Sequence, residues 1–215
     1  FPKALPEGLL GDRAQAPSPR FELGPLGYEE VGTELKERLW LRGGLPQALL
    51  AGTEPEAIAW LGRHLDGLVQ GRLVAAGIHG PATRTRALLE ALAQGQGRTF
   101  PESVAARSLG VSRPTVVRAL AVLERIGLLR FLPSLASPSG KRAILSPAVY
   151  LRDPGVLHAL LGLGGTRVLE ASPHREASWR GFVVEECLKA LPRGLEASRY
   201  LTRDGASLDL VIRRE

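Results

Sequence analysis

The chain has 215 residues, a formal net charge of +6 and a pI near 10.1. Its length favours two or three small domains, and its 44% hydrophobic content is sufficient for a core. The single Cys187 excludes an intrachain disulfide framework and is typical of a reducing cytoplasm, and no apolar run reaches membrane-spanning length. The basic balance favours an acidic polymer as partner. Because the chain begins at Phe1 and contains no Met, we expect a fragment, a processed chain or an incomplete sequence.

The N-terminal part of the chain predicts two helices. Residues 1–30 are too rich in proline and glycine to be mostly regular structure. The first helix is predicted over Thr33–Leu41, with Thr33 as its cap. The second follows Thr53 and Glu56, which have the spacing of a capping box. Its apolar residues recur at helical spacing and predict one buried stripe, made of Ile58, Leu61, Leu65 and Leu68.

Three further helices are predicted between residues 81 and 126. Pro81 starts the first, whose Leu88, Leu89 and Leu92 face inward. Thr99 is predicted to cap the second, which ends at Gly110. Ser112 is predicted to cap the third, with a buried stripe of Val116, Leu120, Leu123 and Ile126. Two helices joined by a tight glycine-containing turn indicate a helix-turn-helix unit.

The segment after these helices predicts a wing. Strands are predicted over residues 128–132 and 142–145, joined by a connection rich in Pro, Ser and Gly that ends in Gly140, Lys141 and Arg142. A helix-turn-helix followed by such a hairpin is a winged helix, which we assign to residues 79–152.

The third helix would be the one that reads DNA. Its early positions outside the apolar stripe face base edges in a major groove, where Arg donates two hydrogen bonds to guanine. Lys141 and Arg142 on the wing would contact phosphates. A winged helix also serves as a protein-contact module, so this alternative stays open. The DNA-binding candidates are Ser112, Arg113, Thr115, Val117, Arg118, Lys141 and Arg142.

The C-terminal part predicts a small α/β unit. Asp153-Pro154-Gly155 predicts a turn that leads into a short apolar helix. A longer helix follows Pro173, and the strands 196–201 and 207–212 are separated by Asp204-Gly205, a strong hairpin signal. The inward residues of the longer helix are predicted to be Trp179, Phe182, Val183, Cys187 and Leu188.

Several stretches, in this order, resemble the C-terminal half of a prokaryotic family of predicted AAA-type ATPases whose C-terminal region is a domain of unknown function. FELGPLGYEEVG is similar to the end of the ATPase core, LWLRGGLPQALL to an inter-domain signature, and SPAVYLRDPGVLHALLG to the stretch after the wing. SWRGFVVEECLKAL and DGASLDLVI resemble a final PD-(D/E)xK nuclease-like module. The implied fold class is mostly α, α+β. It comprises an ATPase end with a helical linker (1–78), a winged helix-turn-helix domain (79–152) and a truncated, degenerate nuclease-like module (153–215).

The chain departs from that family where chemistry is expected. Lys is usual within residues 145–148, and acidic residues are usual at the positions of Arg180 and Ser207. Glu186 and Asp209 are the weak candidates for a metal pair, but a third carboxylate and the catalytic Lys are missing. The competing interpretation is a surface Glu186 and an Asp209 held in the hairpin. No phosphate-binding G-x-x-x-x-G-K-[ST] loop occurs, so we expect ATP and Mg only in a longer parent.

The sequence thus predicts a cytoplasmic DNA-binding winged-helix region of an AAA-type ATPase-like protein, with double-stranded DNA as partner and no intact ATPase or nuclease site. One alternative is a protein-interaction module that packs on an ATPase core or self-associates. A second is a remnant of a metal-dependent nuclease.

Overall fold

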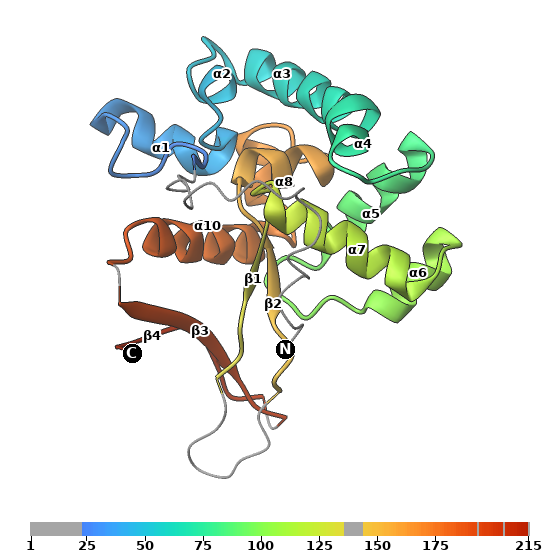
Figure 1. Ribbon diagram of the computed structural model, residues 1–215. Coiled ribbons are helices and arrows are strands. Elements are labelled where there is room, and N and C mark those ends of the chain that lie inside the picture. The colour runs from blue at the N-terminus through green and yellow to red at the C-terminus, as the bar shows by residue number, and fades with distance from the viewer. Residues whose placement is uncertain (1–22, 136–143, 193, 204, 215) are drawn as a thin grey trace, which may run out of the picture.

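The computed structural model describes residues 23–135, 144–192, 194–203 and 205–214. In these residues the chain is an α+β protein, mostly helical, with two small antiparallel sheets (Figure 1). The predicted α+β class with a predominance of helix is therefore confirmed. Lys141 and Arg142 lie outside the described residues. Among the helices of the described ranges, none is both long and apolar enough to cross a bilayer.

The N-terminal helices form a layer along one side of the molecule (Figure 1). They are α1 (Thr33–Arg42), α2 (Pro46–Leu49) and α3 (Glu54–Gly67), which continues through a π-helical segment (Leu68–Arg72) into α4 (Leu73–Ala75). The capping box is confirmed, because the Thr53 hydroxyl accepts from the Glu56 amide and the Glu56 carboxylate accepts from the Thr53 amide. The predicted cap of α1 is wrong: Gly32 is the N-cap and Thr33 lies inside the helix. Ile58, which was predicted to be part of the buried stripe, is 38% exposed, so the prediction is wrong for this residue.

Three helices, α5 (Ala82–Gln94), α6 (Glu102–Leu109) and α7 (Arg113–Arg125), form the middle of the chain. Gly110, in the left-handed region at φ 64°, makes the tight turn between α6 and α7. Ser112 caps α7 as predicted, because its hydroxyl accepts from the Thr115 amide. Thr99 does not cap α6, because its hydroxyl is taken by Arg199 and the N-cap is Pro101. Ile126, predicted to be buried, is 42% exposed beyond the end of α7.

The first sheet pairs β1 (Leu129–Leu132) with β2 (Ala148–Leu151). Arg98 bridges to Val149 on the other edge of β2, so β2 runs between two partners. All four residues of β2 are buried. The strand that pairs with β1 is β2, and of the predicted strand 142–145 the described residues 144 and 145 lie outside any strand, while 142 and 143 are outside the described ranges. The alternation rule misses β2 because a strand buried on both faces has a continuous apolar sequence.

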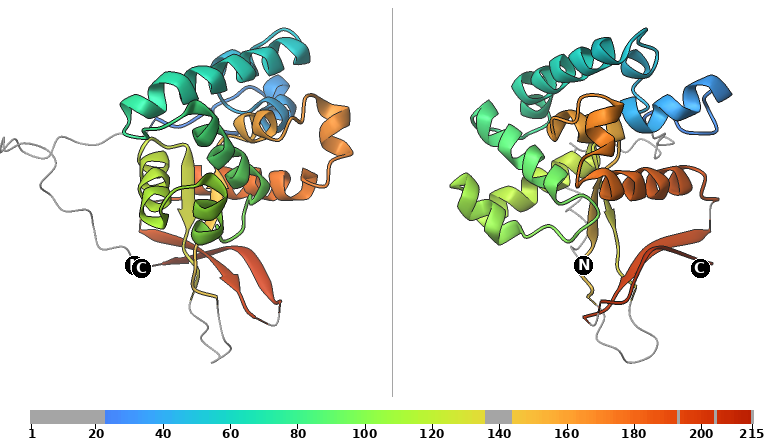
Figure 2. Two further views of the ribbon diagram at one scale, coloured as in Figure 1. Left: turned by 90° about the vertical axis from the view of Figure 1, so that its right-hand side faces the viewer. Right: turned by 180° about the vertical axis from the view of Figure 1, so that it is seen from behind.

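The C-terminal part consists of α8 (Pro154–Leu160), α9 (Thr166–Glu170), α10 (Arg175–Lys189) and the hairpin of β3 (Leu195–Leu201) and β4 (Ser207–Arg214). The predicted hairpin is confirmed by antiparallel pairing from Leu195↔Arg214 to Leu201↔Ser207. Backbone bonds from Arg199 to Pro133 and from Leu135 to Arg199 attach β3 to the chain beyond β1. Figures 1 and 2 show the hairpin crossing the lower end of the β1–β2 pair.

One large core holds most of the chain together. It contains buried side chains from α3 to α8, among them Leu65, Leu89, Leu123, Leu129 and Leu157. This core takes residues from all three predicted segments. The division at 78/79 and 152/153 stays a prediction.

Helix α10 buries a different face from the predicted one. Trp179 is 47% and Val183 39% exposed, and Cys187 is also exposed, so these three inward assignments are wrong. Phe182 is buried as predicted. The buried residues of α10 include two polar ones, since the set is Ser178, Gly181, Phe182, Val184 and Glu185.

Candidate nucleic-acid interface

The N-terminus of α7 is rigidly capped. Ser112 Oγ accepts from the Thr115 amide at 3.3 Å and lies 2.8 Å from Thr115 Oγ1. The Ser112 hydroxyl therefore satisfies an amide of the first turn, and the Thr115 hydroxyl holds the Ser112 side chain in place. Of the candidate residues, Ser112 and Thr115 fix the geometry of this end, and the side chains that project from it are those of Arg113, Val117 and Arg118.

Arg113 is exposed but already paired. Its Nε lies 2.9 Å and its Nη2 2.7 Å from Glu102 Oε2 at the start of α6. The Arg113 side chain is 64% exposed, so the pair is well solvated and contributes little to stability. A phosphate or a guanine could replace the Glu102 carboxylate as the acceptor for Arg113 at a low cost in free energy. An acceptor that binds Arg113 more weakly than Glu102 does would not displace this carboxylate.

Val117 and Arg118 complete the exposed part of this helix. Val117 is 40% exposed, and Arg118 is exposed as well. Arg118 has neither an ion pair nor a hydrogen bond with the parts of the chain that the structure describes. These two residues are thus open to a partner. Lys141 and Arg142 cannot be placed relative to them, since both lie outside the described ranges.

A groove of about 320 Å³ lies beside Arg113, between the start of α6, α7 and the β1–β2 pair. Phe100 and Phe131 provide apolar wall, and Thr99 and Ser146 provide polar wall. Arg199 of β3 holds the polar wall in place: its Nη2 donates to Thr99 Oγ1 at 2.6 Å and to the Ser146 carbonyl at 2.7 Å.

Arg199 was not found from the sequence. It is only 6% exposed, and burial lowers its pKa from the ordinary arginine value. Nothing in the alternation of β3 distinguishes this arginine from a solvent-facing one, because its partners come from distant loops.

The two candidate metal ligands are held by different partners. Glu186 Oε1 lies 2.7 Å from Lys189 Nζ, and Glu186 Oε2 accepts from the Tyr28 amide at 2.5 Å. Asp209 Oδ1, on β4, lies 3.7 Å from Arg180 Nη1 on α10. Arg180 precedes Glu186 by about 9 Å along the axis of α10, at 1.5 Å per residue. Over the described ranges, no group of three His, Cys, Asp or Glu side chains could hold a metal ion. The two carboxylates thus have separate partners, Lys189 and the Tyr28 amide for Glu186 and Arg180 for Asp209.

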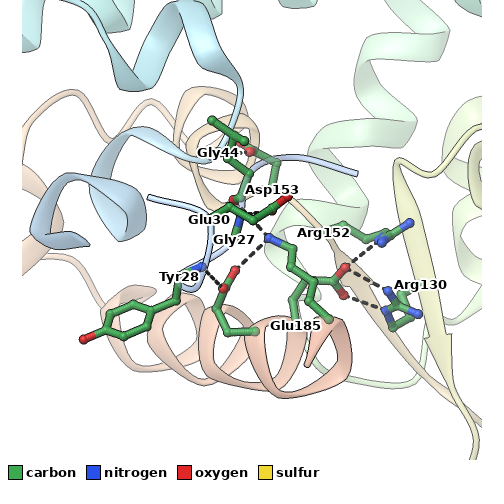
Figure 3. Close-up of polar contacts among 11 residues, drawn as sticks. Gly27, Tyr28, Glu30, Gly44, Arg130, Arg152, Asp153 and Glu185 are labelled. Carbon is green, nitrogen blue, oxygen red and sulfur yellow. Dashed lines mark hydrogen bonds and ion pairs between the residues drawn. The ribbon is translucent and has the colours of Figure 1, made fainter. Parts of the chain in front are cut away.

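The adjacent Glu185, which sequence reasoning missed, is the buried carboxylate of α10. It accepts from Arg130 Nε at 2.6 Å and Arg130 Nη2 at 2.8 Å, and from Arg152 Nε at 2.6 Å. Figure 3 shows the carboxylate of Glu185 between the two guanidinium groups. Its side chain is 3% exposed, so this ion triad ties α10 to β1 and to the end of β2. A buried acid paired with two arginines from another element leaves no local sequence signal.

Asp153 joins the N-terminal helices to α8. Its Oδ1 accepts from the Val156 amide at 2.9 Å. Its Oδ2 accepts from the Gly44 amide at 2.8 Å (Figure 3). The predicted Asp153-Pro154-Gly155 turn is thus the capped start of α8. Burial raises the pKa of Asp153, and the hydrogen bonds from the two amides oppose that shift. An Asp before a Pro is a recognisable cap signal.

A chain of hydrogen bonds crosses from α1 to α8 and α10. Trp40 Nε1 donates to Ser178 Oγ at 3.0 Å, which lies 2.6 Å from His158 Nε2, while His158 Nδ1 lies 2.9 Å from the Leu41 carbonyl. Because a carbonyl only accepts, Nδ1 carries the proton and Nε2 accepts from the serine hydroxyl. Burial lowers the pKa of His158 to about 4, so the imidazole is neutral at pH 7.

The fold and these contacts define a mostly helical α+β protein whose helices are joined by buried polar networks. The chain belongs to the family of the domain of unknown function DUF8612, which matches residues 33–167. It is 36% identical over 191 residues to the uncharacterized proteins Mb2031c of Mycobacterium bovis and Rv2008c of Mycobacterium tuberculosis. The matched region is 89% of this chain but 43% of each relative, so the chain spans less than half of their length. No solved structure matches the chain.

Proposed function

We propose that α5, α6, α7, β1 and β2 form a winged helix and that α7 binds double-stranded DNA. The order of elements supports this: a helix, the Arg98 bridge, two helices joined at Gly110, and then the β1–β2 pair. Arg98 also pairs with Val149, so an extended segment between α5 and α6 joins the β1–β2 pair. The N-terminal half of the second helix of the pair is the part that enters a major groove.

The observation that carries the proposal is the exposed Arg118, which has no partner within the described ranges and lies beside Arg113 and Val117 at this end of α7. The charge distribution agrees with it. Residues 79–152 contain 11 Lys and Arg against three Glu and no Asp, which gives +8, and the rest of the chain carries −2. The positive excess of the chain is thus concentrated in this segment, as expected of the part that meets an acidic polymer. Within the proposal, Lys141 and Arg142 contact backbone phosphates.

A salt titration of binding to a short labelled duplex tests this proposal. We expect affinity that falls steeply with salt, and in Arg118→Ala a salt slope that is smaller by about one for each phosphate that the variant no longer neutralises. Arg113→Ala should weaken binding further in the double variant. Arg63→Ala is the matched control, because Arg63 is an exposed arginine on α3 in the segment without excess positive charge. Binding that is absent at low salt, or equally weakened by Arg63→Ala, would overturn the proposal.

A second candidate function, protein contact, is favoured by the apolar residues on the same helices. Val104 on α6 is 52% and Val117 on α7 is 40% exposed, and the Phe100–Phe131 groove lies beside α7. In this case the face would pack on an ATPase core or on a second copy. Val117→Ser would then abolish association and leave duplex affinity unchanged, whereas the DNA proposal expects Arg118→Ala to have the larger effect on duplex affinity.

The resemblance to AAA-type ATPases extends the proposal to a longer parent protein. ATP and Mg would be bound by that parent outside residues 1–215, because the phosphate-binding loop motif is missing from this sequence. The α10–β4 unit would be a degenerate nuclease-like module in which Arg180 holds Asp209. Hydrolysis of ATP by a longer parent, stimulated by duplex DNA, is the corresponding measurement.

A further inference from the structure

A small cavity lies where α1 ends, between α3, α8 and the loop after α8. Its volume is about 160 Å³, and its walls are mostly apolar, with Leu41, Leu61, Ala159 and Leu163 among them. Figure 1 shows α8 below α3 and to the right of α1, and α8 contacts both helices. An apolar cavity of about 150 Å³ is large enough to take a benzene molecule.

Arg42, on the wall of this cavity, is a buried cation that forms no ion pair within 4 Å among the described residues, although Glu54 on the same wall attracts it from further away. It is 7% exposed, and in the described part of the chain its one hydrogen bond is from Nη1 to the Ala51 carbonyl, at 2.7 Å. Its Nε is buried and has no partner there. Burial, and to a lesser extent the neighbouring Arg38, lower the pKa of Arg42, and Glu54 and Glu56 oppose that shift only in part. A guanidinium nevertheless stays charged, and a buried charge that its neighbours compensate only in part is costly.

The edge formed by Nε and Nη2 is the part of this guanidinium that the described residues leave without a partner. Two parallel N–H groups along such an edge match the two oxygens of a carboxylate. Nε has almost no accessible surface, so a ligand carboxylate would reach Nη2 first, neutralise the charge, and pair with Nε only as the cavity adjusts to it.

The other polar groups of the cavity restrict the ligand further. Both ring nitrogens of His158 are engaged by the Leu41 carbonyl and Ser178, so His158 offers no donor. Glu54 accepts from the Thr166 amide and hydroxyl, which lower the pKa of its carboxyl and keep it ionised beside the cavity. This negative charge opposes every anionic ligand, and it opposes one with two or more negative charges more strongly than a monoanion.

We propose that this cavity binds a small monocarboxylate, with the carboxylate on Arg42 and an apolar group no larger than a benzene ring between α3 and α8. Benzoate is the probe, and benzyl alcohol is its neutral counterpart of similar size. The proposal does not depend on DNA binding by α7.

Thermal unfolding of the full chain with each compound tests it, because a ligand that binds only the folded state raises Tm. We expect benzoate to raise Tm and to bind at least about tenfold more tightly than benzyl alcohol, given the strength of charge-assisted hydrogen bonds. Inorganic phosphate should bind more weakly than benzoate, because it cannot fill the apolar space.

Three variants separate the site from general effects. Arg42→Met removes the charge and should abolish the benzoate shift, while Arg38→Met, one turn earlier on α1, should retain it. Ala159→Leu fills the cavity without touching the guanidinium and should also abolish the shift. The proposal is overturned if benzoate fails to raise the Tm of the parent chain, or if Ala159→Leu keeps the shift. If Arg42→Met does not fold, the Ala159→Leu and benzyl alcohol results decide.

Discussion

The buried, neutral His158 makes the stability of the fold depend on pH. Its pKa is about 4 in the folded chain, against an ordinary value of 6.5. The unfolded chain therefore binds the proton more tightly, and stability is complete above pH 6.5 and falls as the pH drops from 6.5 towards 4. The full difference corresponds to about 3 kcal/mol, of which about 2 kcal/mol is lost by pH 5.

The structure gives the cause of this loss. Protonation would turn Nε2 from a hydrogen-bond acceptor into a donor, so the Ser178 hydroxyl could no longer donate to it. The new positive charge would also be buried. Nδ1 would still donate to the Leu41 carbonyl, which opposes the effect of burial. Because the network joins α1, α8 and α10, acid should loosen the packing of these helices.

Urea unfolding between pH 7.5 and pH 5 measures the effect. His158→Asn keeps a donor for Leu41 and cannot ionise. We expect its free energy of unfolding to be lower than that of the parent at pH 7.5, but to fall by about 2 kcal/mol less than that of the parent between pH 7.5 and pH 5. His79→Gln, at an exposed histidine, should keep the parent slope. Burial also lowers the pKa of His64, but this contribution is common to the parent and the variants. Equal slopes in His158→Asn and the parent would refute the reasoning.

Two further predictions concern the joints between elements. Glu185→Gln removes the carboxylate between two guanidinium groups and should destabilise the fold by about 3 kcal/mol, whereas Glu196→Gln, in an exposed pair, should change unfolding in urea by less than about 1 kcal/mol. In Gly155→Ala the new Cβ would overlap the Arg42 carbonyl of α1, so α8 must move and Tm should fall. Gly67→Ala, in open space in α3, should stabilise by up to about 1 kcal/mol, and the opposite ranking of the two variants by calorimetry would contradict this account.

Local signals in the sequence were sufficient for most helices and for the hairpin. The caps at Thr53 and Ser112, the left-handed turn at Gly110 and the β3–β4 pairing follow from residues close in sequence. Predictions from the sequence were wrong where a side chain contacts a partner that is distant in sequence instead of the neighbouring backbone. Thr99 is the clearest case, because its hydroxyl is used by an arginine 100 positions later instead of a helix end.

In the candidate interface, too, the sequence predicts which residues face outward but not which distant residue each one contacts. The outward positions of Val117 and Arg118 follow from the helical period around Val116 and Leu120, since an amphipathic helix has one buried side. The pairing of Arg113 with Glu102 depends on the angle between α6 and α7, which no spacing in the sequence specifies.

Helix α10 shows why polar burial was the hardest feature to predict. Among the described residues, the large core contains none beyond Leu161, so α10 is attached through smaller clusters around Phe182 and Val184. Rotating α10 by about 100°, the angle between successive residues, would turn Trp179 inward and satisfy an apolar pattern. That rotation would also remove Glu185 from both arginines and Ser178 from His158. Unpaired buried charges cost more than one exposed aromatic side chain, so the polar contacts determine which face is buried and thereby where the hairpin lies.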